Sequence, residues 1–148
     1  MIAVVQRCSE SSVSVEGKVV SSIGKGLMVL LGIKKGDDEI NMNKLVQKVL
    51  DLRVFDDVNG VMNSSVKDIS GELLIISQFT LCADNNKSGN RPSYINAEVP
   101  EISRPMYELF MKKAGEYYDA GKIKGGVFGA DMKVSLINDG PVTIILER

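Results

Sequence analysis

The stretch Leu27-Met28-Val29-Leu30-Leu31 is apolar at every position, so it has no polar face to present to solvent. A short run of this kind is typical of a strand that is buried on both faces, in the middle of a sheet. Gly24-Lys25-Gly26 comes directly before it and supplies a turn. The stretch therefore predicts a central strand, around which the rest of the chain is organised.

Further strands are predicted on the N-terminal side. Residues 2–5 are apolar, and residues 12–15 alternate between serine and valine, as a strand with one buried face does. Glu16-Gly17 makes a turn before a second apolar pair, Val19-Val20. The first 33 residues therefore predict a β meander.

Two helices are predicted downstream of the meander. The first opens at Gly36-Asp37-Asp38, with an aspartate as its N-cap, and carries apolar residues at helical spacing. The second is expected to have Ser103 as its cap and Pro105 in its first turn, and to stop at Gly121.

The remaining apolar runs predict short strands. One covers residues 52–55 and is followed by the turn Asp57-Val58-Asn59-Gly60. Another covers residues 73–76 and continues to Thr80, before a polar loop over residues 84–93, and two final strands flank Gly140-Pro141. With no linker or repeat, residues 1–148 predict a single α/β domain that is richer in strand than in helix.

Composition restricts the chemistry and the location of the chain. A net charge of −1 argues against a protein that grips a long stretch of nucleic acid, but it permits contact with one end. Cys8 and Cys82 are expected to be buried, reduced thiols, which fits the cytoplasm. No apolar stretch approaches the ~18–20 residues of a membrane span, and the N-terminus does not resemble a secretory signal. We therefore expect a cytoplasmic protein without a membrane partner.

The chain contains no histidine, which excludes Ser-His-Asp and Cys-His arrangements. Nucleotide-binding glycine loops are absent as well, and a zinc site would have to use the two cysteines and carboxylates. Polar strand ends remain as candidates. Ser77-Gln78-Phe79-Thr80 closes one apolar run, and Asn138-Asp139-Gly140-Pro141-Val142-Thr143 lies between two others. Such ends either form a rigid site or simply satisfy the backbone where a strand finishes.

Thr80 is a poor nucleophile by itself, because an unactivated hydroxyl needs an adjacent base and none is near in sequence. The Gly140-Pro141 bond is cis or trans on the sequence alone, and a trans hairpin connection has the higher base rate.

Several segments, spread over the whole chain in order, resemble those of the D-aminoacyl-tRNA deacylases. Gly125 and Pro105 depart from the usual pattern of that family without touching its two most specific phrases. The segments that carry the resemblance are Val4-Val5-Gln6-Arg7, Ser12-Val13-Ser14-Val15, Ser77-Gln78-Phe79-Thr80-Leu81-Cys82-Ala83, Gly89-Asn90-Arg91-Pro92-Ser93, Phe128-Gly129-Ala130-Asp131-Met132 and Asn138-Asp139-Gly140-Pro141-Val142-Thr143.

The resemblance implies layered sheets with two main helices packed on one side (β/β/α). It also implies hydrolysis of the ester that joins a D-amino acid, or glycine mischarged on tRNA-Ala, to the 3′ end of tRNA, with no metal or organic cofactor. A homodimer is implied, in which a cis Gly140-Pro141 pair enters the partner's site, holds the substrate's amino group and rejects L side chains.

The resemblance also assigns the site. Ser77, Gln78, Phe79 and Thr80 are implied to line the ester and the terminal adenosine, with backbone N–H groups offered by Phe79 and Thr80. Arg7, Phe128 and Met132 lie in matching segments and are weaker pocket candidates. Two other readings stay open: a non-catalytic dimeric module that binds a small amino compound or an RNA 3′ end, and a metal-dependent hydrolase.

Overall fold

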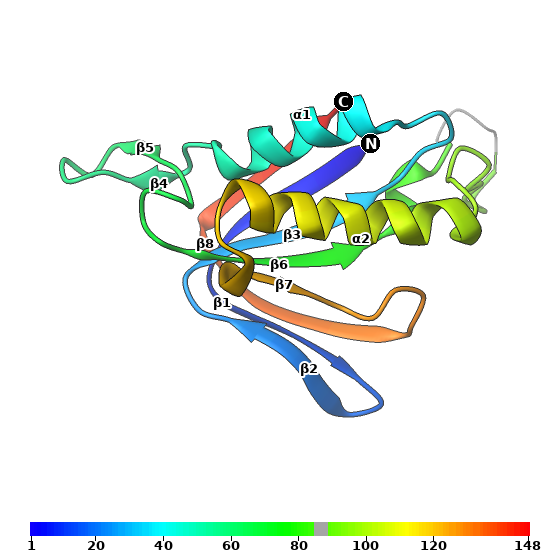
Figure 1. Cartoon of the computed structure of the whole chain (residues 1–148). Coiled ribbons are helices and arrows are strands. Elements are labelled where there is room, and N and C mark those ends of the chain that lie inside the picture. Colours follow the sequence, from blue (N-terminus) through cyan, green and yellow to red (C-terminus); the bar gives the residue numbers. More distant parts are fainter. Residues whose placement is uncertain (85–88) are drawn as a thin grey trace.

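Strand β3 (Gly26–Gly32) lies inside the principal sheet, as its uniformly apolar sequence predicts (Figure 1). The computed structural model describes residues 1–84 and 89–148. β1 (Ile2–Val15) pairs antiparallel with one edge of β3, and β6 (Glu72–Ser77) pairs parallel with the other. β7 (Ile123–Gly125) adds a short parallel strand beside β6, after the brief 3-10 helix η2 (Ala120–Lys122).

A second layer is built from the far halves of two long strands. The C-terminal half of β1 pairs with β2 (Lys18–Ile23), and β8 (Met132–Glu147) runs antiparallel along nearly the whole of β1. In Figure 1, β2, the C-terminal half of β1 and the N-terminal half of β8 lie below the principal sheet. Apolar side chains fill the space between the layers, among them Val13, Met28 and Leu74.

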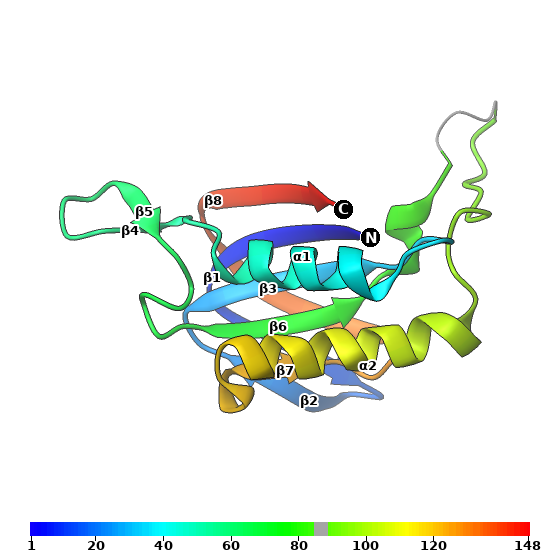
Figure 2. The same ribbon diagram turned by 45° about the horizontal axis from the view of Figure 1, so that its top comes forward.

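Both main helices cover the opposite face of the principal sheet (Figures 1 and 2). They are α1 (Glu39–Leu50) and α2 (Pro100–Tyr117), and the larger core lies between them and the sheet. Asp38 caps α1 as predicted, because its carboxylate accepts a 2.8 Å hydrogen bond from the Asn41 N–H. The observed order of sheet, sheet and helices confirms the β/β/α architecture.

The predicted start of the second helix is wrong by one turn. α2 begins at Pro100, where proline at the first helical position loses no intrahelical hydrogen bond. Ser103 is inside the helix, and its hydroxyl donates to the carbonyl of Val99 at 3.0 Å instead of capping. Pro105 therefore lies beyond the first turn, and the helix ends at Tyr117, before Gly121.

The stretch before the turn at residues 57–60 is also less regular than predicted. Of residues 52–55, only Phe55 enters a strand, in β4 (Phe55–Asp56), which pairs with β5 (Met62–Ser64). The turn between them is confirmed: the Asp57 carboxylate accepts from the N–H groups of Asn59 at 2.8 Å and Val61 at 3.2 Å. These bonds also hold the pKa of Asp57 below its ordinary value.

The C-terminal region differs from the predicted pair of strands. β8 is one element whose two halves both pair with β1, and Gly140-Pro141 bulges out between the pairs Cys8↔Asn138 and Gln6↔Thr143. The connection is thus not a hairpin, because the chain continues in the same direction after the bulge. The Gly140-Pro141 peptide bond is cis.

Two other expectations can be compared with the structure. Cys8 and Cys82 are free and buried, as predicted. Among the described residues, no helix has the length and apolar character needed to cross a membrane. The predicted polar loop lies partly outside the described residues, since these omit 85–88.

Candidate functional site

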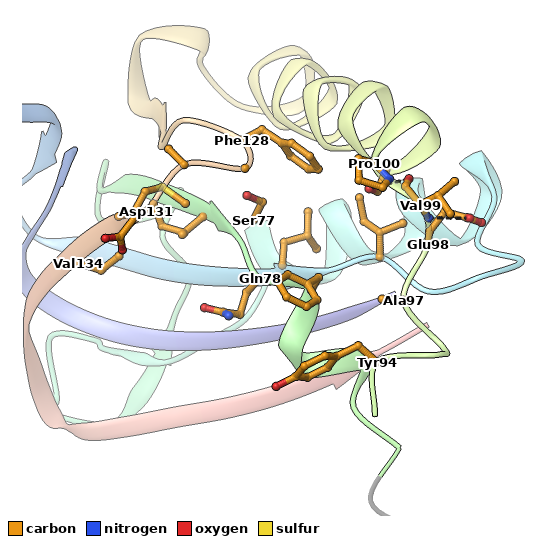
Figure 3. A pocket seen from close by; sticks show the side chains of 18 residues that line it. Ser77, Gln78, Tyr94, Ala97, Glu98, Val99, Pro100, Phe128, Asp131 and Val134 are labelled. Atoms are coloured by element: carbon orange, nitrogen blue, oxygen red, sulfur yellow. Dashed lines mark hydrogen bonds between the residues drawn. The ribbon is translucent and has the colours of Figure 1, made fainter. Parts of the chain in front are cut away.

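A cavity of about 660 Å³ opens where β6 ends (Figure 3). Ser77 points into it, with Phe128 on the wall next to α2 and Tyr94 on the opposite side. The strand does not continue to Thr80 as predicted, because the chain turns after Ser77 into the short 3-10 helix η1 (Phe79–Cys82). This turn directs consecutive residues toward one space, which an extended strand would send to alternate faces.

The turn is fixed by its contacts with the end of β3. The Gln78 N–H donates to the carbonyl of Leu31 at 2.8 Å. Gly32 then leaves room for η1, since a Cβ there would lie 3.0 Å from the Leu81 Cβ and 3.1 Å from the Gln78 carbonyl oxygen. A glycine at the end of the central strand therefore sets the position of the pocket floor.

The start of η1, next to the cavity, has two backbone donors and one oriented side-chain amide. The N–H groups of Phe79 and Thr80 are the first of η1, and neither has a backbone acceptor among residues 1–84 and 89–148. The Gln78 side-chain amide donates to the Thr80 hydroxyl at 2.5 Å. Phe79 is 58% exposed and meets the Tyr94 ring edge-on at 5.0 Å. The arrangement can bind an oxygen that carries negative charge.

The facing wall comes from the segment between β7 and β8. Phe128 and Met132, two of the candidate residues, line the cavity. Gly126 permits this packing, because a Cβ there would lie 2.5 Å from the Met132 sulfur. Behind the wall, the Tyr107 hydroxyl donates to the Ile75 carbonyl at 2.8 Å, and burial raises the Tyr107 pKa to about 12. Tyr107 is therefore a structural donor and no base at neutral pH.

The structure places Arg7, Gly140 and Pro141 elsewhere. The Arg7 guanidinium donates to the carbonyls of Val54 at 2.7 Å and Asp139 at 3.0 Å, so it supports the bulge of β8. In the sheet, Arg7 pairs with Leu27, whereas Leu31 pairs with Ala3 and Ser77. Leu27, beside Arg7, and Leu31, beside Ser77, are four residues apart along β3, which corresponds to roughly 13 Å. Within one chain the predicted residues thus form two groups.

The first group brings Ser77, Gln78 and Phe79 together with Phe128 and Met132 around the cavity. Thr80 is adjacent to it through the bond from Gln78. The second group, Arg7 with Gly140 and Pro141, lies at the end of the sheet that carries β4, since Arg7 also contacts Asp56 at 3.6 Å.

Sequence reasoning missed several lining residues. They come from the irregular chain before α2 and from its first turn, where no periodic pattern identifies a buried face; they are Tyr94, Ala97, Glu98, Val99, Pro100 and Ser103. Pro100 was a usable signal, because proline favours the first turn of a helix and the helix start forms part of the wall.

Among the described residues, few charged groups lie near the cavity. Glu98 and Asp131 line it, and Lys133 donates to both Asp131 carboxylate oxygens at 3.0 and 3.1 Å. In the part of the chain that the structure describes, no three His, Cys, Asp or Glu side chains are grouped so that they could hold a metal ion.

Comparison with known proteins gives consistent results. The family profile described as D-Tyr-tRNA(Tyr) deacylase matches residues 4–147. Proteins named D-aminoacyl-tRNA deacylase from Persephonella marina and Flavobacterium psychrophilum are 54% and 52% identical, each over 99% of this chain and 97% of the relative.

Solved structures agree. A structure titled c-Myc DNA Unwinding Element Binding Protein superposes with a TM-score of 0.95 at 43% identity, covering 100% of this chain and 99% of that one. A probable eukaryotic D-amino acid tRNA deacylase, at 14% identity and a TM-score of 0.81, covers 98% and 97% and shares the fold. By sequence along nearly its full length, and by fold, this chain belongs to the D-Tyr-tRNA(Tyr) deacylase family.

Proposed function

We propose that this chain hydrolyses the ester bond of D-aminoacyl-tRNA, releasing the free D-amino acid and tRNA, and that residues 1–148 act as one domain in the cytoplasm. Membership of the family supports the reaction. The observation that carries the proposal is the turn from β6 into η1: the N–H groups of Phe79 and Thr80 have no backbone acceptor among the described residues, and they stand beside a cavity lined by Ser77, Gln78 and Phe79 that is large enough for an aminoacylated nucleoside.

The proposed chemistry needs little from side chains. An aminoacyl ester is already activated, and the neighbouring ribose hydroxyl can assist its hydrolysis. The N–H groups of Phe79 and Thr80 would then stabilise the oxyanion that develops on the ester carbonyl. Gln78, held by the Thr80 hydroxyl, would orient the ester. This assignment is consistent with a chain that has no histidine to act as general base.

Chirality would be checked by a second copy of the chain. Gly140 and Pro141 do not line the cavity of their own chain, which supports a role in which they would enter the cavity of a partner. Their carbonyls would hold the substrate's α-amino group and leave no space for an L side chain. Glycine has no side chain that could collide with these carbonyls, so glycine mischarged on tRNA-Ala would also be released.

The function is tested by incubating the purified protein with D-aminoacyl-tRNA and L-aminoacyl-tRNA that carry the same amino acid. We expect D-selective release of the amino acid, with equal rates in the presence of EDTA. Binding of both substrates without hydrolysis would favour the non-catalytic module, and loss of activity in EDTA would favour a metal-dependent hydrolase.

The shared site is tested by mixing two inactive variants. Thr80→Pro removes one N–H donor from the pocket, and deletion of Gly140 and Pro141 removes the inserted turn. If each site combines both chains, mixed dimers contain one intact site, and refolding an equal mixture restores about a quarter of wild-type activity. A mixture that remains inactive, with dimers demonstrated by light scattering, would contradict the shared site.

A further inference from the structure

Arg104 occupies an unusual position at the edge of the cavity. It lies on the first part of α2, is exposed, and holds its guanidinium carbon 5.0 Å from the centre of the Phe128 ring. One of its terminal nitrogens lies 4.0 Å from where a Cβ would stand on Gly129. Phe128 and Gly129 both line the cavity, so the guanidinium is at its rim.

The charge of Arg104 has no carboxylate partner. Among the described residues, no acidic oxygen lies within 4.0 Å of it, although Glu101 and Glu108 are on the same helix. The other cations of α2, Lys112 and Lys113, both pair with Glu116. Stacking on an aromatic face holds a guanidinium in place while leaving its N–H groups free to donate in the plane.

Among the residues that the structure describes, those that line the cavity include two carboxylates, Glu98 and Asp131, and no lysine or arginine. Lys133, the cation nearest to them in sequence, is bound to Asp131. A polyanionic substrate therefore meets little positive charge on the cavity wall, and Arg104 supplies an unpaired cation at its edge.

We infer that Arg104 binds a phosphodiester of the substrate RNA, adjacent to the terminal nucleoside whose ester enters the cavity. This inference rests on the proposed function. The phosphodiester that precedes the terminal nucleoside is the negative charge closest to the ester, so it lies at the mouth when the ester is inside. Arginine donates to two phosphate oxygens at once, which fixes position as well as charge. Arg104 is a positioning residue and takes no part in bond cleavage.

The test compares Arg104→Gln, Arg104→Lys and the control Lys112→Gln on two substrates. Lys112 lies on the same helix, is exposed and leaves Glu116 paired with Lys113 when removed. One substrate is D-aminoacyl-tRNA, and the other is the same D-amino acid esterified to adenosine, which has no phosphate. Values of kcat and KM are measured at several KCl concentrations, and binding of uncharged tRNA is measured separately.

We expect Arg104→Gln to raise KM for D-aminoacyl-tRNA roughly three- to tenfold with little change in kcat, as loss of one charged contact predicts. The slope of log KM against log salt should fall by roughly 0.7, the value for one phosphate of a single strand. Hydrolysis of the aminoacyl-adenosine should be unchanged. Arg104→Lys should keep the salt slope and recover part of the KM, and Lys112→Gln should match the wild type.

Other results would overturn the inference. An equal loss on both substrates would mean that Arg104 only positions Phe128, and no loss on either would mean that no phosphate contact exists. The same loss in Lys112→Gln would indicate diffuse attraction. If the wild type hydrolyses neither substrate, the proposed function fails, and the role of Arg104 is then decided by tRNA binding: unchanged affinity in Arg104→Gln overturns it.

Discussion

Thr80 contributes both a side-chain hydroxyl and a backbone N–H group next to the cavity. Its hydroxyl accepts a hydrogen bond from the Gln78 amide, and its backbone N–H is one of the two donors at the start of η1. No histidine exists to activate the hydroxyl. The geometry therefore favours a role for Thr80 in orienting Gln78 and in supplying an N–H group, and argues against a nucleophilic hydroxyl.

Replacing Thr80 by Val or Ala separates these roles. Both variants keep the N–H group and lose the acceptor for Gln78, so we expect the rate of D-aminoacyl-tRNA hydrolysis to fall by roughly tenfold, the value of one hydrogen bond. Single-turnover deacylation measures this directly, with Thr80→Ser as the control that retains a hydroxyl. Complete loss in the Val and Ala variants, with activity preserved in Ser, would restore the nucleophile interpretation.

Among the secondary-structure elements, η1 depends most on a single neighbouring position. It packs against the end of β3 at Gly32, where the atoms nearest to an added Cβ are the Leu81 Cβ, the Gln78 carbonyl oxygen and the Cys82 sulfur, at 3.0 to 3.2 Å. Two of these neighbours are backbone or the first side-chain atom, so they move only if η1 moves.

Gly32→Ala is therefore expected to displace η1 from β3. We expect the free energy of unfolding to decrease by about 1–3 kcal/mol, as for other overpacked sites, and deacylation to fall as well because the N–H groups shift. Urea unfolding and single-turnover kinetics measure the two effects. Gly24→Ala is the matched control, since its Cβ would meet only a Glu72 carboxylate oxygen at 3.7 Å, and it should leave both unchanged.

At the scale of the whole molecule, two thiols and two phenols share one direction of pKa shift. Burial raises the pKa of the Cys8 thiol from 9.0 to about 11 and that of Tyr107 from 10.0 to about 12, and it also raises the pKa of Cys82 and Tyr118. The neutral forms are therefore the ones that the folded state favours. The unfolded chain loses these protons at lower pH than the folded chain does.

It follows that stability should be lost on the alkaline side. The contribution of these groups to the free energy of unfolding is fully present below pH 9 and declines as the pH rises from 9 toward 12, because the unfolded chain ionises at lower pH than the folded chain. Urea unfolding at pH 7, 9, 10 and 11 measures this. In Cys8→Ala the decline between pH 9 and 11 should be shallower, and an identical decline in that variant would contradict the assignment to Cys8.

The parts of the fold that the sequence predicted are those with strong local patterns. The uniformly apolar run of β3 and the Asp38 cap of α1 were both recognisable because one element determines them. The pairing of β8 with β1 was not, because a register between residues 117 to 145 positions apart, from Val15↔Met132 to Ile2↔Glu147, leaves no local pattern. The end of β6 was misjudged for a similar reason: the turn after Ser77 is imposed by the Leu31 carbonyl.

The residues of the candidate site also fall into those that the sequence identified and those that it did not. Ser77, Gln78, Phe128 and Met132 were found through their segments and do line one cavity. Tyr94 and Glu98 were not, since they come from irregular chain whose position depends on the start of α2. That Arg7 and Gly140 lie apart from this cavity follows only from the sheet register, which no single segment contains.

The bulge in β8 has a consequence for how this family can diversify. Between its two anchoring pairs, β1 advances from Cys8 to Gln6 while β8 advances from Asn138 to Thr143, so the extra residues are accommodated outside the ladder. In a hairpin, an insertion alters the strands that follow. Here β8 pairs with β1 on both sides of the bulge, as Val13↔Val134 and Val5↔Ile144 show, so the same neighbouring strand sets the register before and after it. The sequence of the turn can therefore change while the paired strands on both sides keep their register.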